Sequence, residues 1–178
     1  MISCNSESIV STVSLENGIV LPTIHGENIT SLISDSGVTR YRLKAKVWDM
    51  YSGDKEPYWH FPEGIYIEKF DSLFNIEGYI EADTAYFFEK KELWQLKENV
   101  HVQTVIGDQF DTSELFWNRR EPSNSINAIY SDRFVRVTTA TGEIITGTGF
   151  RSDMLMSNYR FYKPASEVII EETDSINE

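Results

Sequence analysis

Short stretches in which apolar and polar residues alternate recur along most of this chain, and they restrict its fold more than any other feature. The clearest is VTRYRLKAKVWDMY, residues 38–51, in which basic side chains alternate with Tyr41, Leu43, Ala45 and Val47. A period of two residues places these four side chains on one face of a half-buried strand. We therefore expect an extended segment here, with its apolar face turned towards a core.

Similar stretches follow at intervals of about ten residues, the spacing of an all-β sandwich or roll. They include GIYIEKF, GYIEA, NVHVQT, RFVRVTT, TGEII, NYRFY and EVIIEE. The dipeptides Gly107-Asp108 and Thr141-Gly142 are short hairpin signals between them. Residues 89–98 are good helix formers. The extended character of the flanking residues nevertheless favours a strand, a turn at residues 90–91 and a second strand.

Three longer units repeat loosely, each passing from small polar residues through an apolar pair and a turn to an alternating Val/Ile strand. Repeated antiparallel pairs bury their faces on their neighbours and form an elongated stack with open ends. No change of composition divides residues 30–172, which we interpret as one domain. Residues 1–29 are interpreted as an N-terminal tether and residues 173–178 as an acidic tail.

The charge of the chain excludes some classes of partner. A formal net charge of −12 lacks the basic stripe of a nucleic-acid surface, so we expect no nucleic-acid partner. The same charge argues against electrostatic adsorption to an anionic membrane. No apolar run is long enough to cross a membrane.

The single cysteine, Cys4, excludes an internal disulfide. The sequence Met1-Ile2-Ser3-Cys4 is like the end of a bacterial lipoprotein cleavage site, although the preceding charged and apolar regions are missing. Two interpretations stay open: Cys4 is a lipidation site, or it is a free thiol near a frayed end.

Patterns typical of catalysis or metal binding are missing. His25, His60 and His101 lie far apart without metal-ligand spacing, and we expect no metal site and no cofactor. Glu81 and Asp83 share one face of a predicted strand and are the carboxylate pair that a jelly-roll hydrolase would need. Such pairs are common on an acidic surface, so we expect that the protein is not an enzyme.

The aromatic residues, 13% of the chain, allow three interpretations. The four tryptophans, with nearby tyrosines, would form a sugar-stacking platform in a carbohydrate-binding β-sandwich, or they would pack a large flat core. In the third interpretation, two sheets do not close on each other, and the apolar gap between them holds acyl chains.

Seven segments that occur in order carry a resemblance to a known family. They are SDSGVTRYRLKA (34–45), FPEGIYIEKFD (61–71), IEADTAYFF (80–88), LWQLKENVHV (93–102), TSELFW (112–117), IYSDRFVRV (129–137) and ITGTGFRSD (145–153). Together they resemble LptC, the periplasmic component of the lipopolysaccharide-export ABC transporter, and especially its Bacteroidetes branch. From Ala82 onward the chain is similar to the wider LptA/OstA-type repeat.

The resemblance implies an all-β fold, a twisted open β-jelly roll of two antiparallel sheets with the acyl chains of lipid A between them. It implies a periplasmic protein, anchored to the inner membrane of a Gram-negative bacterium, that receives lipopolysaccharide from LptF/LptG-type transporter subunits. The protein would pass it to an LptA-type periplasmic bridge without catalysing a reaction. Many family members begin with a transmembrane helix; here acyl chains on Cys4 would supply the anchor instead.

The predicted site residues form two groups. The lipid-facing residues are those on the alternating apolar faces, and each is also a candidate for plain core packing: Leu43, Ala45, Val47, Ile65, Ile67, Ile80, Ala82, Phe87, Val100, Val102, Leu115, Trp117, Val135 and Val137. The C-terminal edge that would pair with the downstream partner contains Tyr159, Phe161, Val168 and Ile170. The lead-in and first strand form the predicted edge on the transporter side.

Overall fold

The computed structural model describes residues 21–35, 37–53 and 56–165. Its strands are β1 (Ile24–Asp35), β2 (Val38–Tyr51), β3 (Tyr58–Phe61), β4 (Ile65–Phe70), β5 (Ile76–Ala82), β6 (Thr84–Phe88), β7 (Leu93–Thr104), β8 (Gln109–Asn118), β9 (Ile129–Thr138), β10 (Ile144–Ser152) and β11 (Tyr159–Ala165). A short 3-10 helix, η1 (Glu89–Lys91), follows β6. The all-β prediction is confirmed. The predicted second strand is β7, the predicted turn at residues 90–91 lies in η1, and the strand expected before it is divided into β5 and β6.

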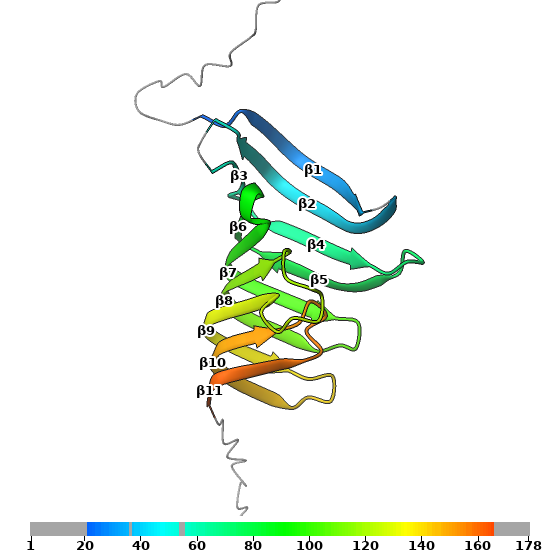
Figure 1. Cartoon of the computed structure of the whole chain (residues 1–178), viewed down its shortest axis with the longest axis vertical. Helices are drawn as coiled ribbons and strands as arrows, with labels where there is room; N and C mark the ends of the chain where they lie inside the picture. Colours follow the sequence, from blue (N-terminus) through cyan, green and yellow to red (C-terminus); the bar gives the residue numbers. More distant parts are fainter. Residues whose placement is uncertain (1–20, 36, 54–55, 166–178) are drawn as a thin grey trace, which may run out of the picture.

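All strands belong to one antiparallel sheet, whose members are stacked along the long axis of the molecule from β1 at one end to β11 at the other (Figure 1). One edge of β2 pairs with β1, and its other edge pairs with both β3 and β4. Likewise, one edge of β7 pairs with both β5 and β6. The pairs β3/β4 and β5/β6 therefore each behave as one interrupted strand, and the sheet continues through them.

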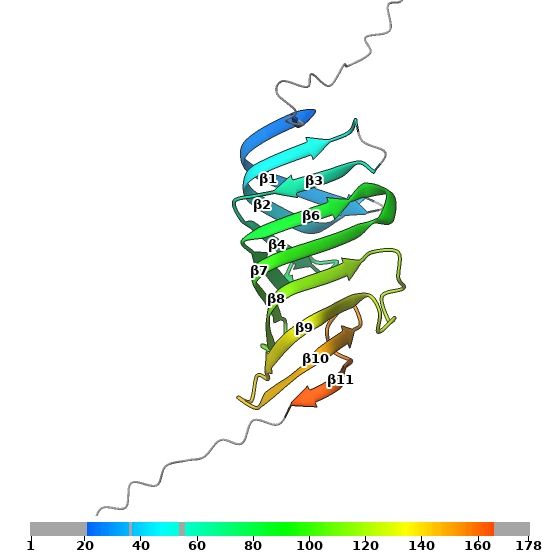
Figure 2. The same cartoon turned by 90° about the vertical axis from the view of Figure 1, so that its left-hand side faces the viewer.

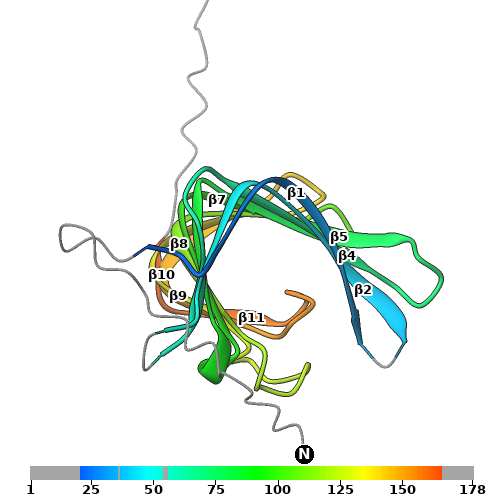
Figure 3. The same ribbon diagram turned by 90° about the horizontal axis from the view of Figure 1, so that it is seen from above.

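Bends in the long strands curl this sheet into a trough. In β7 the ladder skips from Lys97 to Val100, and the skipped residues Glu98 and Asn99 have φ of 62° and 46°. Register shifts also occur in the β8–β9 and β9–β10 pairings. Bulges of this kind bend a strand and increase its twist. Seen from above, the strands follow an open curve rather than a closed ring, as Figure 3 shows.

The resemblance implied two antiparallel sheets. In the described residues a single sheet bends so that its two halves face each other across the trough. The concave side carries one apolar cluster that contains large, fully buried side chains such as Phe61, Leu96, Phe110 and Phe150. In β2 the alternation shifts by one residue after Ala45, so that Trp48 rather than Val47 packs against this cluster.

β1 and β11 are the edge strands of the described part of the chain, because each pairs with one neighbour only. Figure 2 shows the face formed by β3, β6 and the strands that follow down to β11. β1 begins at Ile24, so residues 24–29, assigned from the sequence to the tether, belong to the sheet.

Candidate functional site

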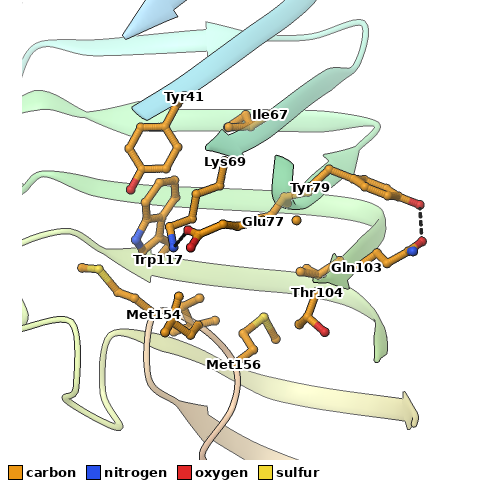
Figure 4. A pocket seen from close by; sticks show the side chains of 15 residues that line it. Tyr41, Ile67, Lys69, Glu77, Tyr79, Gln103, Thr104, Trp117, Met154 and Met156 are labelled. Carbon is orange, nitrogen blue, oxygen red and sulfur yellow. Dashed lines mark hydrogen bonds and ion pairs between the residues drawn. The ribbon is translucent and has the colours of Figure 1, made fainter. Parts of the chain in front are cut away.

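A cavity lies on the concave side of the sheet, where β2, β4, β5, β7 and β8 pass beside the loop that joins β10 to β11 (Figure 4). Its volume is about 60 Å³, within about 560 Å³ of empty space that includes the part open to solvent. Its walls are mostly apolar and are contributed by Tyr41, Ile67, Ile80, Val102, Trp117, Ile129, Met154, Leu155 and Met156, among others. Such a lining fits a hydrocarbon chain better than a polar substrate.

The β10–β11 loop, residues 153–158, forms one wall of this cavity and lies inside the curve of the sheet (Figure 3). Met156 anchors it: its side chain is only 2% exposed and packs into the core cluster. The loop is also tied to the β8–β9 connection, because the backbone N–H of Met154 donates to the carbonyl oxygen of Ser123 at 3.0 Å. Leu155, by contrast, remains 54% exposed beside the cavity.

One ion pair interrupts the apolar lining. Lys69 Nζ lies 2.6 Å from Glu77 Oε2, and the two side chains are 31% and 33% exposed. The two groups face each other in Figure 4. Neither residue is among the site residues predicted from the sequence. A period-2 count from Ile65 and Ile67 would have placed Lys69 on the same face, but nothing in the sequence pattern predicts Glu77 beside it.

Two indole N–H groups on the concave side, those of Trp48 and Trp117, are buried without a hydrogen-bond partner in the described residues. A buried donor without an acceptor costs free energy, of the order of 1–3 kcal/mol. The Trp117 ring lines the cavity, where Tyr41 packs on it with ring centroids 5.3 Å apart. An oxygen carried by a ligand is one way to supply the missing acceptor at Trp117.

The predicted lipid-facing residues lie close together on the concave side, with one exception. Twelve of the fourteen are buried, Ile80 is half-buried at the cavity, and Val47 is half-buried without joining the core cluster. Ile67, Ile80, Val102 and Trp117 line the cavity itself. The other buried residues are packed against each other as core in this structure, and their contact with lipid stays a prediction.

The predicted partner edge is described only in part. Tyr159 and Phe161 lie in β11 and pack against the core cluster, and burial raises the pKa of the Tyr159 phenol. Val168, Ile170 and the candidate lipidation site Cys4 lie outside the described residues. Within the described part, no helix is long and apolar enough to cross a membrane.

The convex side carries charged and aromatic side chains. Arg42 donates to Glu68, which is buried under it, and this bond holds the pKa of the Glu68 carboxyl below its usual value. On the same side of the sheet, rings form stacked pairs across β2, β3 and β6. Tyr51 and Tyr58 lie 4.6 Å apart, and His60 and Tyr86 4.4 Å apart, measured between ring centroids.

The residues considered for catalysis or metal binding do not converge. His25 and His101 bond to Asp49 and Asp111 on neighbouring strands. Burial lowers the pKa of the His60 imidazole. Glu81 and Asp83 are both exposed, and Asp83 accepts a hydrogen bond from Asn99. Among the described residues, no three His, Cys, Asp or Glu side chains are grouped so that they could hold a metal ion.

A scan against protein-family models gave no match for the chain, and a search of curated proteins gave none either.

Proposed function

We propose that the protein is a carrier for the acyl chains of an amphipathic lipid, which lie in the trough of the sheet. The single observation that carries this proposal is the apolar cavity on the concave side of the sheet. A trough that is open along one side admits a lipid chain without enclosing the whole polar head, which a closed pocket does not. Nothing in this role requires a catalytic group.

The resemblance to LptC extends the proposal to a specific transport step. In that role the trough would be an open β-jelly roll in the periplasm, held at the inner membrane through the N-terminal segment. It would receive lipopolysaccharide from LptF/LptG-type subunits and pass it to an LptA-type bridge. The two edge strands, β1 and β11, support this reading, because unpaired strand edges at opposite ends allow partners to add strands there.

Photo-crosslinking at a matched pair of residues tests the carrier proposal. Leu155 and Phe134 are both large apolar side chains with similar exposure, 54% and 52%. Leu155 lines the cavity, whereas Phe134 lies in β9 next to the inward-facing Val135 and therefore points to the convex side. A photoreactive residue at each position, in Gram-negative cells, should give a lipopolysaccharide adduct at Leu155 only. Equal labelling at both positions, or none at Leu155 in a folded protein, would refute the proposal.

A carbohydrate-binding role is the second candidate, and one observation favours it. On the convex side, Tyr58, Tyr86, Phe88, Gln95 and Lys97 line a shallow hollow that combines aromatic rings with hydrogen-bonding groups. The tryptophans do not contribute, because all four pack on or within the concave core cluster. A crosslinking result with no adduct at Leu155, together with binding of oligosaccharides that Tyr86→Ala abolishes, would favour this role instead.

A further inference from the structure

The ion pair in the cavity results from a local irregularity of the sheet. Lys69 pairs with Gly78 and the next residue, Phe70, pairs with Ile76, so Glu77 is the extra residue of a β-bulge. A bulge changes the direction of a side chain relative to regular alternation. Here it brings the Glu77 carboxylate to the Lys69 ammonium, on the wall of the cavity. The charge of a lysine on the concave face is thereby compensated within the site.

Stability does not explain why this pair is present. Partly exposed ion pairs contribute little to folding, and apolar side chains of similar volume serve at least as well in an apolar wall. Each side chain keeps about a third of its surface exposed, and both line the cavity. The pair is therefore available to something that enters the cavity.

Both groups also have hydrogen-bonding capacity to spare. Within the described residues, Lys69 directs one N–H to Glu77 Oε2, which leaves two ammonium N–H groups and the second carboxylate oxygen without a protein partner. A ligand group that contains an acceptor next to a donor can bond to both at once. A simple anion bound to Lys69 would also lie close to the Glu77 carboxylate, which repels it. The net charge of the chain, −12, adds to this repulsion.

We propose that Lys69 and Glu77 form a polar clamp for the head of a lipid whose chain lies in the cavity. The clamp selects an uncharged head that carries a hydrogen-bond donor next to an acceptor, such as hydroxyl or amide groups, over a simple anion. This inference rests on the proposed carrier function, and it names the head-group chemistry that the same site prefers. Lys69 and Glu77 determine specificity; the apolar wall holds the chain.

Three probes with the same acyl chain test the clamp: monomyristoylglycerol, myristate and methyl myristate, each competing with a fluorescent lipid for the purified protein. The wild-type protein should bind the glycerol ester about tenfold more tightly than the methyl ester, a difference of about 1.4 kcal/mol. Myristate should bind no more tightly than the glycerol ester. The double variant Lys69→Met/Glu77→Leu should lose the tenfold preference for the glycerol ester over the methyl ester.

Single substitutions add a charge-specific readout. Glu77→Gln leaves the Lys69 charge uncompensated and should shift the preference towards myristate. Lys46→Met, which removes an exposed lysine outside the cavity lining, is the matched control and should change nothing. Tighter binding of myristate by the wild type, or an unchanged preference in the double variant, would overturn the clamp alone. Failure of every probe to bind would overturn the carrier function and the clamp together.

Discussion

Gly78 in β5 tests how tightly the interrupted strands are held in the sheet. A Cβ atom added to Gly78 would lie 2.5 Å from the carbonyl oxygen of Gln103 in β7, about 0.9 Å inside the 3.4 Å at which ordinary contact begins. The obstacle is backbone, so relief requires the two strands to separate at the Gly78–Thr104 pair. Overpacking of this kind costs about 1–3 kcal/mol. The reduced entropy of the unfolded chain returns about 0.4–1 kcal/mol.

We therefore expect Gly78→Ala to lower the free energy of unfolding by roughly 1–2 kcal/mol, measured by urea denaturation as a lower midpoint with an unchanged slope. Gly26→Ala is the control. Its added Cβ would meet Ile29 Cδ1 at 2.9 Å, and this flexible side-chain end can move aside. The control should unfold within about 0.5 kcal/mol of the wild type. If Gly78→Ala is as stable as Gly26→Ala, the close approach of β5 and β7 is wrong.

Two further predictions concern the core and the convex side. Leu96→Ala, at a fully buried position, should destabilise the protein by about 2–5 kcal/mol. Leu73→Ala, at a side chain that is 80% exposed, should change stability by less than about 0.5 kcal/mol. Equal denaturation midpoints of the two variants would contradict the packing described. The hydrogen bond from Arg42 lowers the pKa of Glu68 in the folded state. The stability that the Glu68 carboxylate contributes is therefore fully present above its unfolded pKa of about 4.3. This stability is lost as the pH falls through the lower pKa of the folded state. Glu68→Gln should therefore flatten the loss of stability between about pH 5 and pH 3, and an unchanged pH profile of unfolding would exclude that role.

The sequence predicts the local structure of this protein better than it predicts the shape of the sheet. Alternation locates β2 and β7 correctly because each long run of period-2 pattern is a property of the strand itself. The pairing of β2 with both β3 and β4 involves residues distant in sequence. No local pattern indicates that two short strands occupy one place in the sheet, so the pairing that makes the described strands one sheet could not be predicted.

The candidate site shows the same division. Where alternation ran without a break, as at Ile65, Ile67 and Val102, the residues of the predicted apolar face lie on the concave side, and their contact with lipid stays a prediction. The prediction failed where a bulge or bend reset the count, because one extra residue moves every following side chain to the opposite face. Unbroken alternation places Val47 on the concave face, but Val47 does not join the core cluster. Unbroken alternation does not place Glu77 there, but the bulge turns its side chain towards Lys69.

Within the described residues, the composition of the edge strand β11 limits where a partner can add a strand. β11 ends in Lys163, Pro164 and Ala165, and a proline has no N–H with which to extend a ladder, while a lysine on an edge disfavours further pairing. The part of β11 that remains suitable is Tyr159–Tyr162, next to the loop that closes one side of the cavity. A partner paired there would place its own strand beside the end of the trough where Met156 anchors that loop. In the proposed carrier, the partner-binding edge and the lipid cavity are therefore joined by a single short connection, residues 153–158.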